Sequence, residues 1–118
     1  MSYGFLVSFA FWLGCSSPKT DSAALLNCTT IDKHDVTWTN WGQGFFMTWC
    51  QSCHSKTAID RHGAPSGVDF DTENDVITWR NRVQKRVIDE QSMPIGGGIS
   101  GEELNRLSEY LYSLDCSQ

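Results

Sequence analysis

The chain has 118 residues and a formal net charge of −5, which is the size of one small domain. The acidic balance excludes nucleic acid as an expected partner, because phosphate binding needs a basic surface. Five tryptophans, six phenylalanines and three tyrosines are a heavy aromatic content for so short a chain. Such a content suits a pocket that surrounds a large flat ring.

The N-terminal stretch indicates export. Residues 2–14 carry no charge and are mostly apolar; they are too few to span a bilayer comfortably but fit the apolar part of a secretory signal. We therefore expect a signal peptide over residues 1–14, a tether and irregular lead-in over 15–37, and the folded domain over 38–118. An uncleaved membrane anchor, or a signal in which Cys15 has no role, is the alternative.

The first helix is predicted over residues 40–53. Trp38, Trp41, Phe45 and Trp49 recur at steps of three and four residues, which places them in one stripe along a helix. We interpret this stripe as core that packs on the last helix.

At the end of this helix stands Cys50-Gln51-Ser52-Cys53-His54. This C-x-x-C-H pattern is typical of covalent haem attachment: the two thiols add to the two vinyl groups, and the histidine binds the iron. A C-x-x-C pair alone also occurs in thiol–disulfide oxidoreductases and in zinc sites. The histidine that follows directly favours haem.

Two further helices follow. Thr72 is a predicted N-cap, with Asp75 three residues later, for a helix that ends near residue 90. Ser100 and Glu103 form a predicted capping box for the last helix, which ends near Leu114. The expected buried stripes are Val76, Trp79, Val83 and Val87 in the former, and Leu104, Leu107, Leu111 and Leu114 in the latter. With no alternating strand pattern, the predicted fold class is all-α.

Met93 is the predicted sixth ligand of the iron. It stands in a loop directly before Pro94, which stiffens the chain. Met47 lies inside the first helix, close to the attachment motif. The alternative for Met93 is an ordinary buried methionine. His34 and His62 compete for the ligand role, but each is interpreted as a surface histidine; either would lower the reduction potential relative to methionine.

Together these features resemble a class I-type cytochrome c domain over residues 38–114. The resemblance implies a small fold of about three helices wrapped around one covalently bound haem c. It implies that Cys50 and Cys53 form the thioethers and that His54 and Met93 are the axial ligands. In that family a proline carbonyl usually accepts a hydrogen bond from the proximal histidine, and Pro65 is the matching residue.

The chain is also similar to single-haem lipoproteins of bacteria, which carry features like Phe45-Phe46, Gly63-Ala64-Pro65 and a late cysteine. Leu13-Gly14-Cys15 resembles their lipobox, in which the cysteine is acylated and becomes the new N-terminus. The resemblance implies a protein that faces the periplasm on a lipid anchor, and Ser16 resembles the pattern of outer-membrane lipoproteins.

Two cysteines, Cys28 and Cys116, remain after haem and lipid are assigned. An oxidising compartment permits a disulfide between them. Because the first and last helices pack together in cytochrome c folds, we expect this pair to be joined. Two free thiols, or a disulfide to another molecule, are the alternatives.

The expected function is electron transfer to and from redox partner proteins, without catalytic residues. One alternative is a haem peroxidase or gas sensor, which needs a displaceable sixth ligand. A second is a thiol–disulfide oxidoreductase that uses Cys50 and Cys53 as a free pair.

Overall fold

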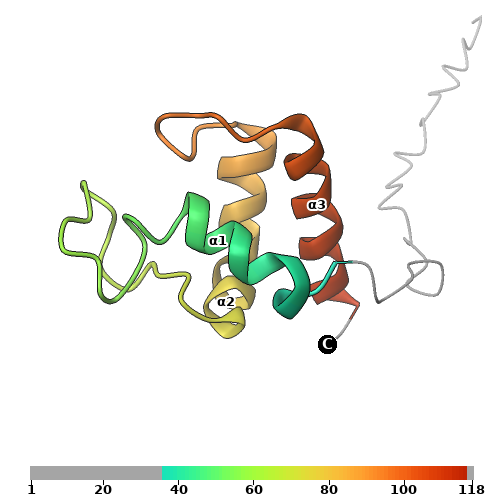
Figure 1. Cartoon of the computed structure of the whole chain (residues 1–118), viewed down its shortest axis with the longest axis horizontal. Coiled ribbons are helices and arrows are strands. Elements are labelled where there is room, and N and C mark those ends of the chain that lie inside the picture. Colours follow the sequence, from blue (N-terminus) through green and yellow to red (C-terminus); the bar gives the residue numbers. More distant parts are fainter. Residues whose placement is uncertain (1–35, 117–118) are drawn as a thin grey trace, which may run out of the picture.

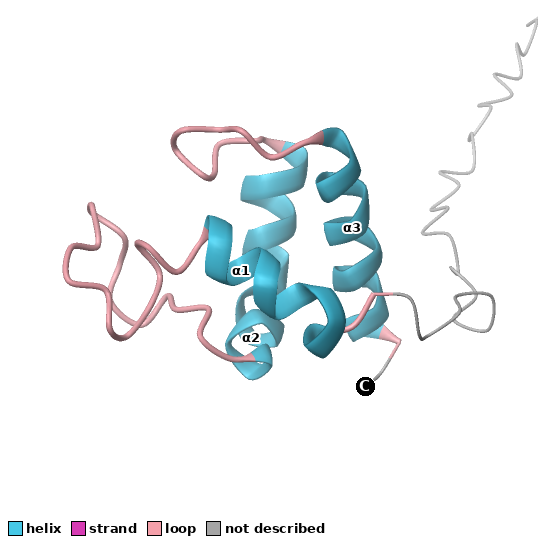
Figure 2. Ribbon diagram, in the orientation of Figure 1, coloured by secondary structure: helices cyan, strands magenta, loops and turns pink. Residues whose placement is uncertain are grey.

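The computed structural model describes residues 36–116. The predicted signal peptide, Cys15, Cys28 and His34 lie outside these residues. In the described part the chain forms helices joined by loops and contains no strand, so the all-α prediction is confirmed. Figure 2 shows the helices and the two long loops that connect them.

The first helical segment consists of η1 (Trp38–Gly42), a π-helical turn, and α1 (Gln43–Trp49). It begins at Thr37, whose hydroxyl accepts a hydrogen bond from the Asn40 backbone while the Asn40 side chain accepts one from the Thr37 backbone. The predicted helix extended to residue 53. The segment ends at Trp49 because the motif residues turn the chain away.

The second segment consists of α2 (Glu73–Val83) and η2 (Gln84–Asp89), again with a π-helical part. Its capping box between Thr72 and Asp75 is the predicted one. Val76, Val83 and Val87 are buried as expected. Trp79 is half-buried, and its indole N–H donates to the Gly67 carbonyl at 3.2 Å.

The last helix, α3 (Gly101–Asp115), begins at the predicted capping box of Ser100 and Glu103. It contacts both η1 and η2. In Figure 1, α1 crosses in front of α2, and α3 runs alongside α2.

The core lies where these helices meet. Phe46 and Tyr110 are completely buried, although neither belongs to the predicted stripes. Gly42 allows the close approach, since a Cβ at this position would lie 3.1 Å from the Tyr110 ring. The buried apolar residues are Phe45, Phe46, Phe70, Val76, Val83, Val87, Leu107, Tyr110, Leu111 and Leu114.

Both long loops extend from the helices toward the same side, away from α3 (Figure 1). One follows α1 and carries the Cys-x-x-Cys-His motif; the other joins η2 to α3 and carries Met93. The helices therefore form a base from which both sets of candidate ligands project.

Candidate functional site

The attachment motif is a series of tight turns that begins where α1 ends. The amide of Cys53 donates to the Cys50 carbonyl at 3.2 Å, and the amide of His54 donates to the same carbonyl at 2.8 Å. Cys50 and Cys53 are free thiols, and both are half-buried. These bonds hold Cys50, Cys53 and His54 within one series of turns.

A short segment just before α2 holds the motif in place. The Phe70 amide donates to the His54 carbonyl at 2.9 Å, and the Gln51 side chain donates to the Phe70 carbonyl at 2.8 Å. The Phe70 ring lies 5.3 Å from the imidazole, centroid to centroid. The backbone and the ring of this one residue thus both contact the motif.

The orientation of His54 is set by Val68. Its Nδ1 atom lies 2.8 Å from the Val68 carbonyl oxygen. Because a carbonyl only accepts, Nδ1 carries the proton and Nε2 keeps its lone pair for a metal. This is the orientation that a metal-binding histidine requires.

The prediction that Pro65 supplies this acceptor is wrong. The Pro65 carbonyl instead accepts from the Arg61 guanidinium at 2.8 Å. The chain continues three residues further before it passes the imidazole, so the acceptor is Val68. The proline position of the family pattern indicates the correct loop but not the residue whose carbonyl reaches Nδ1.

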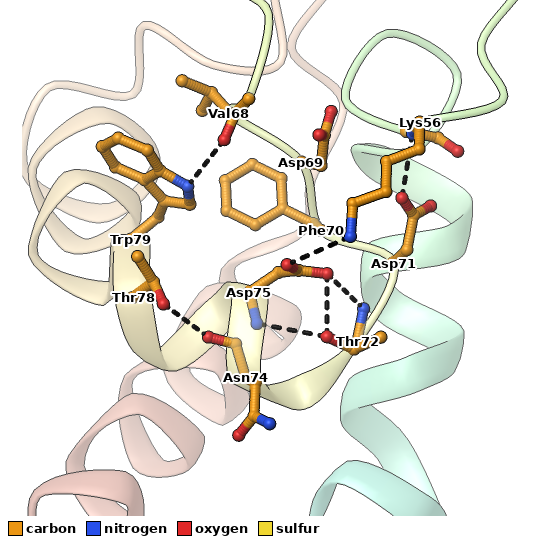
Figure 3. A network of polar contacts seen from close by, with 12 residues as sticks. Lys56, Val68, Asp69, Phe70, Asp71, Thr72, Asn74, Asp75, Thr78 and Trp79 are labelled. Carbon is orange, nitrogen blue, oxygen red and sulfur yellow. Dashed lines mark hydrogen bonds and ion pairs between the residues drawn. The ribbon is translucent and has the colours of Figure 1, made fainter.

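Polar contacts tie the motif loop to the start of α2 (Figure 3). The Lys56 amide donates to the Asp71 carboxylate at 2.9 Å. The ammonium group of Lys56 lies 3.8 Å from Asp75 in the α2 capping box. The hydrogen bond from the Lys56 backbone is the largest cause that lowers the pKa of Asp71. These contacts join the beginning of the motif loop, at Lys56, to its end at the start of α2.

The surroundings of Cys50 make its thiol unreactive as a nucleophile. Burial, followed by the nearby Cys53, raises the pKa of Cys50 from 9.0 to about 12. Cys50 is therefore protonated at neutral pH. Cysteines that exchange disulfides have lowered pKa values instead.

Met93 lies in the second loop, partly buried against the core. It lines a cavity of about 80 Å³ together with Pro94, Gly98 and Leu104. Its amide donates to the Arg86 carbonyl at 3.1 Å, at the end of the second helical segment. The Met93–Pro94 peptide bond is cis.

Trp49 connects this loop to the motif. It directly precedes Cys50, and its ring lies against Gly98, where a Cβ would be 3.4 Å away. Its indole N–H donates to Glu103 in the α3 capping box at 3.1 Å. The loop that carries Met93 is thus anchored next to the motif, which the stripe pattern of Trp49 did not predict.

The other candidate ligands within residues 36–116 are at the surface. His62 is exposed, and its Nδ1 lies 3.6 Å from the Asp60 carboxylate. Met47 is 62% exposed on α1.

Cys116, which follows α3, is disulfide-bonded. Since Cys50 and Cys53 are free, its partner is outside the described residues. The predicted partner, Cys28, is also outside them, so the pairing stays a prediction.

Arg61 is a structural residue of the site that sequence reasoning missed. Its guanidinium donates to four carbonyls and one carboxylate of the motif loop. The only signal in the sequence is an arginine within turn-forming residues. Its acceptors are mostly backbone carbonyls, which every residue type supplies, so no pattern indicates them.

The donor set fits a haem. Two free thiols are separated by two residues, the neighbouring imidazole has its Nε2 free, and a half-buried thioether lies in the second loop. Among residues 36–116, no three His, Cys, Asp or Glu side chains form a group that could hold a metal ion by themselves. A haem iron needs no such group, because the porphyrin supplies four of its ligands. No helix in the described part is long and apolar enough to cross a membrane.

No protein-family model, curated protein or solved structure matches this chain.

Proposed function

We propose that this protein is an exported, membrane-tethered c-type cytochrome with one haem, which carries single electrons between redox partner proteins. The observation that carries the proposal is the hydrogen bond from His54 Nδ1 to the Val68 carbonyl within the Cys-x-x-Cys-His turns. It fixes the tautomer in which Nε2 is free to bind iron. When bound, the haem iron supplies a one-electron couple.

The protein's own residues would have three tasks. Cys50 and Cys53 would hold the group covalently, and His54 and Met93 would bind its iron. The aromatic side chains beside the motif, among them Phe70 and Trp49, exclude water from it. If His54 and Met93 both bind the iron, no open site would remain for oxygen or peroxide, and the protein would act as a carrier rather than an enzyme.

The anchor belongs to the same proposal. Acylation of Cys15 would hold the domain at a bacterial membrane facing the periplasm, where redox partners are within reach of the tether. Two or more acyl chains give stable anchoring, whereas one is marginal.

The test is expression of the full chain in a host that performs cytochrome c maturation, followed by intact mass and reduced-minus-oxidised spectroscopy. We expect one covalently bound haem, which is lost in the Cys50→Ala, Cys53→Ala variant. Ser52→Ala, within the same motif, is the matched control and keeps the haem. A colourless wild-type protein with a free dithiol would support the thiol–disulfide alternative, and carbon monoxide binding at neutral pH would support the gas-sensor or peroxidase alternative.

A further inference from the structure

Arg61 uses its whole hydrogen-bonding capacity inside the motif loop. An arginine has five N–H groups, and Arg61 makes five hydrogen bonds. The acceptors are the carbonyls of Ser55 at 2.7 Å, Ala64 at 3.3 Å, Pro65 at 2.8 Å and Val68 at 3.1 Å, and the carboxylate of Asp69 at 2.7 Å.

One of these acceptors is shared with the proposed iron ligand. The Val68 carbonyl oxygen accepts from His54 Nδ1 at 2.8 Å and from the Arg61 guanidinium at 3.1 Å. Arg61 also forms an ion pair with Asp69. This pair is shielded from water, since the two side chains are only 23% and 8% exposed. A partly buried charge acts on its neighbours with little screening.

We infer that Arg61 is a positioning residue that sets the reduction potential of the proposed haem through the shared Val68 carbonyl. The inference rests on the proposed function. The guanidinium holds the carbonyl beneath the imidazole and draws electron density from its oxygen, so the oxygen accepts more weakly from Nδ1–H. A weaker bond at Nδ1 makes the imidazole a weaker electron donor to iron and favours the reduced state. Asp69 offsets part of this effect.

The inference predicts opposite effects of the two partners. Arg61→Gln removes the charge, strengthens the Nδ1–H bond and lowers the potential. Asp69→Asn leaves the Arg61 charge without its counter-ion and raises the potential. At a fixed solution potential, we expect each variant to change the ratio of reduced to oxidised protein by up to about tenfold. This corresponds to a shift in reduction potential of about 59 mV for a one-electron couple.

The experiment is redox titration of the holoprotein, together with NMR of the His54 Nδ1–H resonance in the reduced state. Arg106→Gln is the matched control, because it removes the same charge from an exposed position on α3. Arg61→Lys keeps the charge but not the planar fork. It should keep a potential between those of the wild type and Arg61→Gln.

The outcomes separate the alternatives. Opposite shifts in potential, each accompanied by a shift of the Nδ1–H resonance, support the inference. Shifts in potential without movement of that resonance would mean that the charges act through space and would overturn it, as would unchanged potentials. If Arg61→Gln does not fold, Asp69→Asn decides alone. A wild-type protein with no haem would remove the proposed function and this inference together, whereas a haem protein with unchanged potentials removes only the inference.

Discussion

The hydrogen bond from His54 Nδ1 to the Val68 carbonyl leaves the lone pair of Nε2 free for a metal. The second proposed ligand, Met93, is held by a backbone hydrogen bond to Arg86 and by burial against the core. The two candidate ligands therefore depend on different loops and can be tested separately.

Met93→Ala should remove the weak near-infrared band that sulfur-to-iron ligation produces in the oxidised protein. It should also lower the reduction potential, because methionine ligation raises it. The measurement is near-infrared absorption with redox titration. Met47→Ala is the matched control, since Met47 is exposed on α1. Persistence of the band in Met93→Ala would disprove the ligand assignment.

At the scale of elements, the helix starts follow from capping boxes: the predicted N-cap Thr72 and the predicted capping box at Ser100 are both confirmed. The close packing between elements rests on single small residues such as Gly42. Two predictions concern these features.

Gly42→Val should destabilise the domain by about 1–3 kcal/mol, the usual effect of overpacking. The added side chain would meet the Tyr110 ring, which is completely buried. Gly44→Val is the matched control, because a Cβ there has no neighbour within 4 Å. Urea unfolding of both variants measures the difference, and equal stabilities would contradict the packing described here.

Glu103→Gln should flatten the acid side of the stability–pH profile. Hydrogen bonds from the Ser100 backbone, the Ser100 hydroxyl and the Trp49 indole lower the pKa of Glu103 below its ordinary 4.5. Its folded pKa is depressed, so its contribution is present above the unfolded value and is lost as the pH falls through the folded pKa.

Urea unfolding at several pH values on either side of about 4.5 is the measurement. Glu109→Gln, exposed on the same helix, should keep the wild-type slope. A Glu103→Gln profile as steep as that of the wild type would exclude this contribution.

Sequence alone predicted three helices and the N-caps of the second and third, Thr72 and Ser100, because capping and periodicity are local; it did not predict Thr37 as the N-cap of the first. It did not predict the π-helical segments η1 and η2 or the burial of Phe46 and Tyr110, which follow from how helices cross. In the site, the spacing of Cys50, Cys53 and His54 predicts haem attachment, and this stays a prediction. The acceptor Val68 and its neighbour Arg61 could not be found, because loop conformation decides which carbonyl reaches a side chain.

For the whole molecule, the bond at Cys116 connects the end of α3 to a cysteine outside the described residues. Reduction, or a Cys28→Ser, Cys116→Ser variant, should destabilise the protein by roughly 4–5 kcal/mol on the chain-entropy model, less any strain. Alkylation without reductant and peptide mapping identify the partner. Labelling of both Cys28 and Cys116 in the native protein would rule the pairing out.

Cys15 should be acylated in the native membrane fraction. The intact mass should exceed that of the chain from Cys15 to Gln118 plus haem by a diacylglyceryl group and usually one more acyl chain. Cys15→Ser should release the protein from membranes while the haem spectrum stays unchanged. A soluble, unmodified wild-type protein would reject the anchor.

The docking of Phe70 onto the motif has a consequence for biosynthesis. The Phe70 amide and carbonyl are bonded to His54 and Gln51 and fix the motif turns, in which burial keeps the half-buried Cys50 thiol protonated. If the protein has the proposed function, an enzyme that attaches the haem would have to reach both thiols before these hydrogen bonds form. Maturation would then compete with folding during export, and a chain that closes first would be trapped without its cofactor.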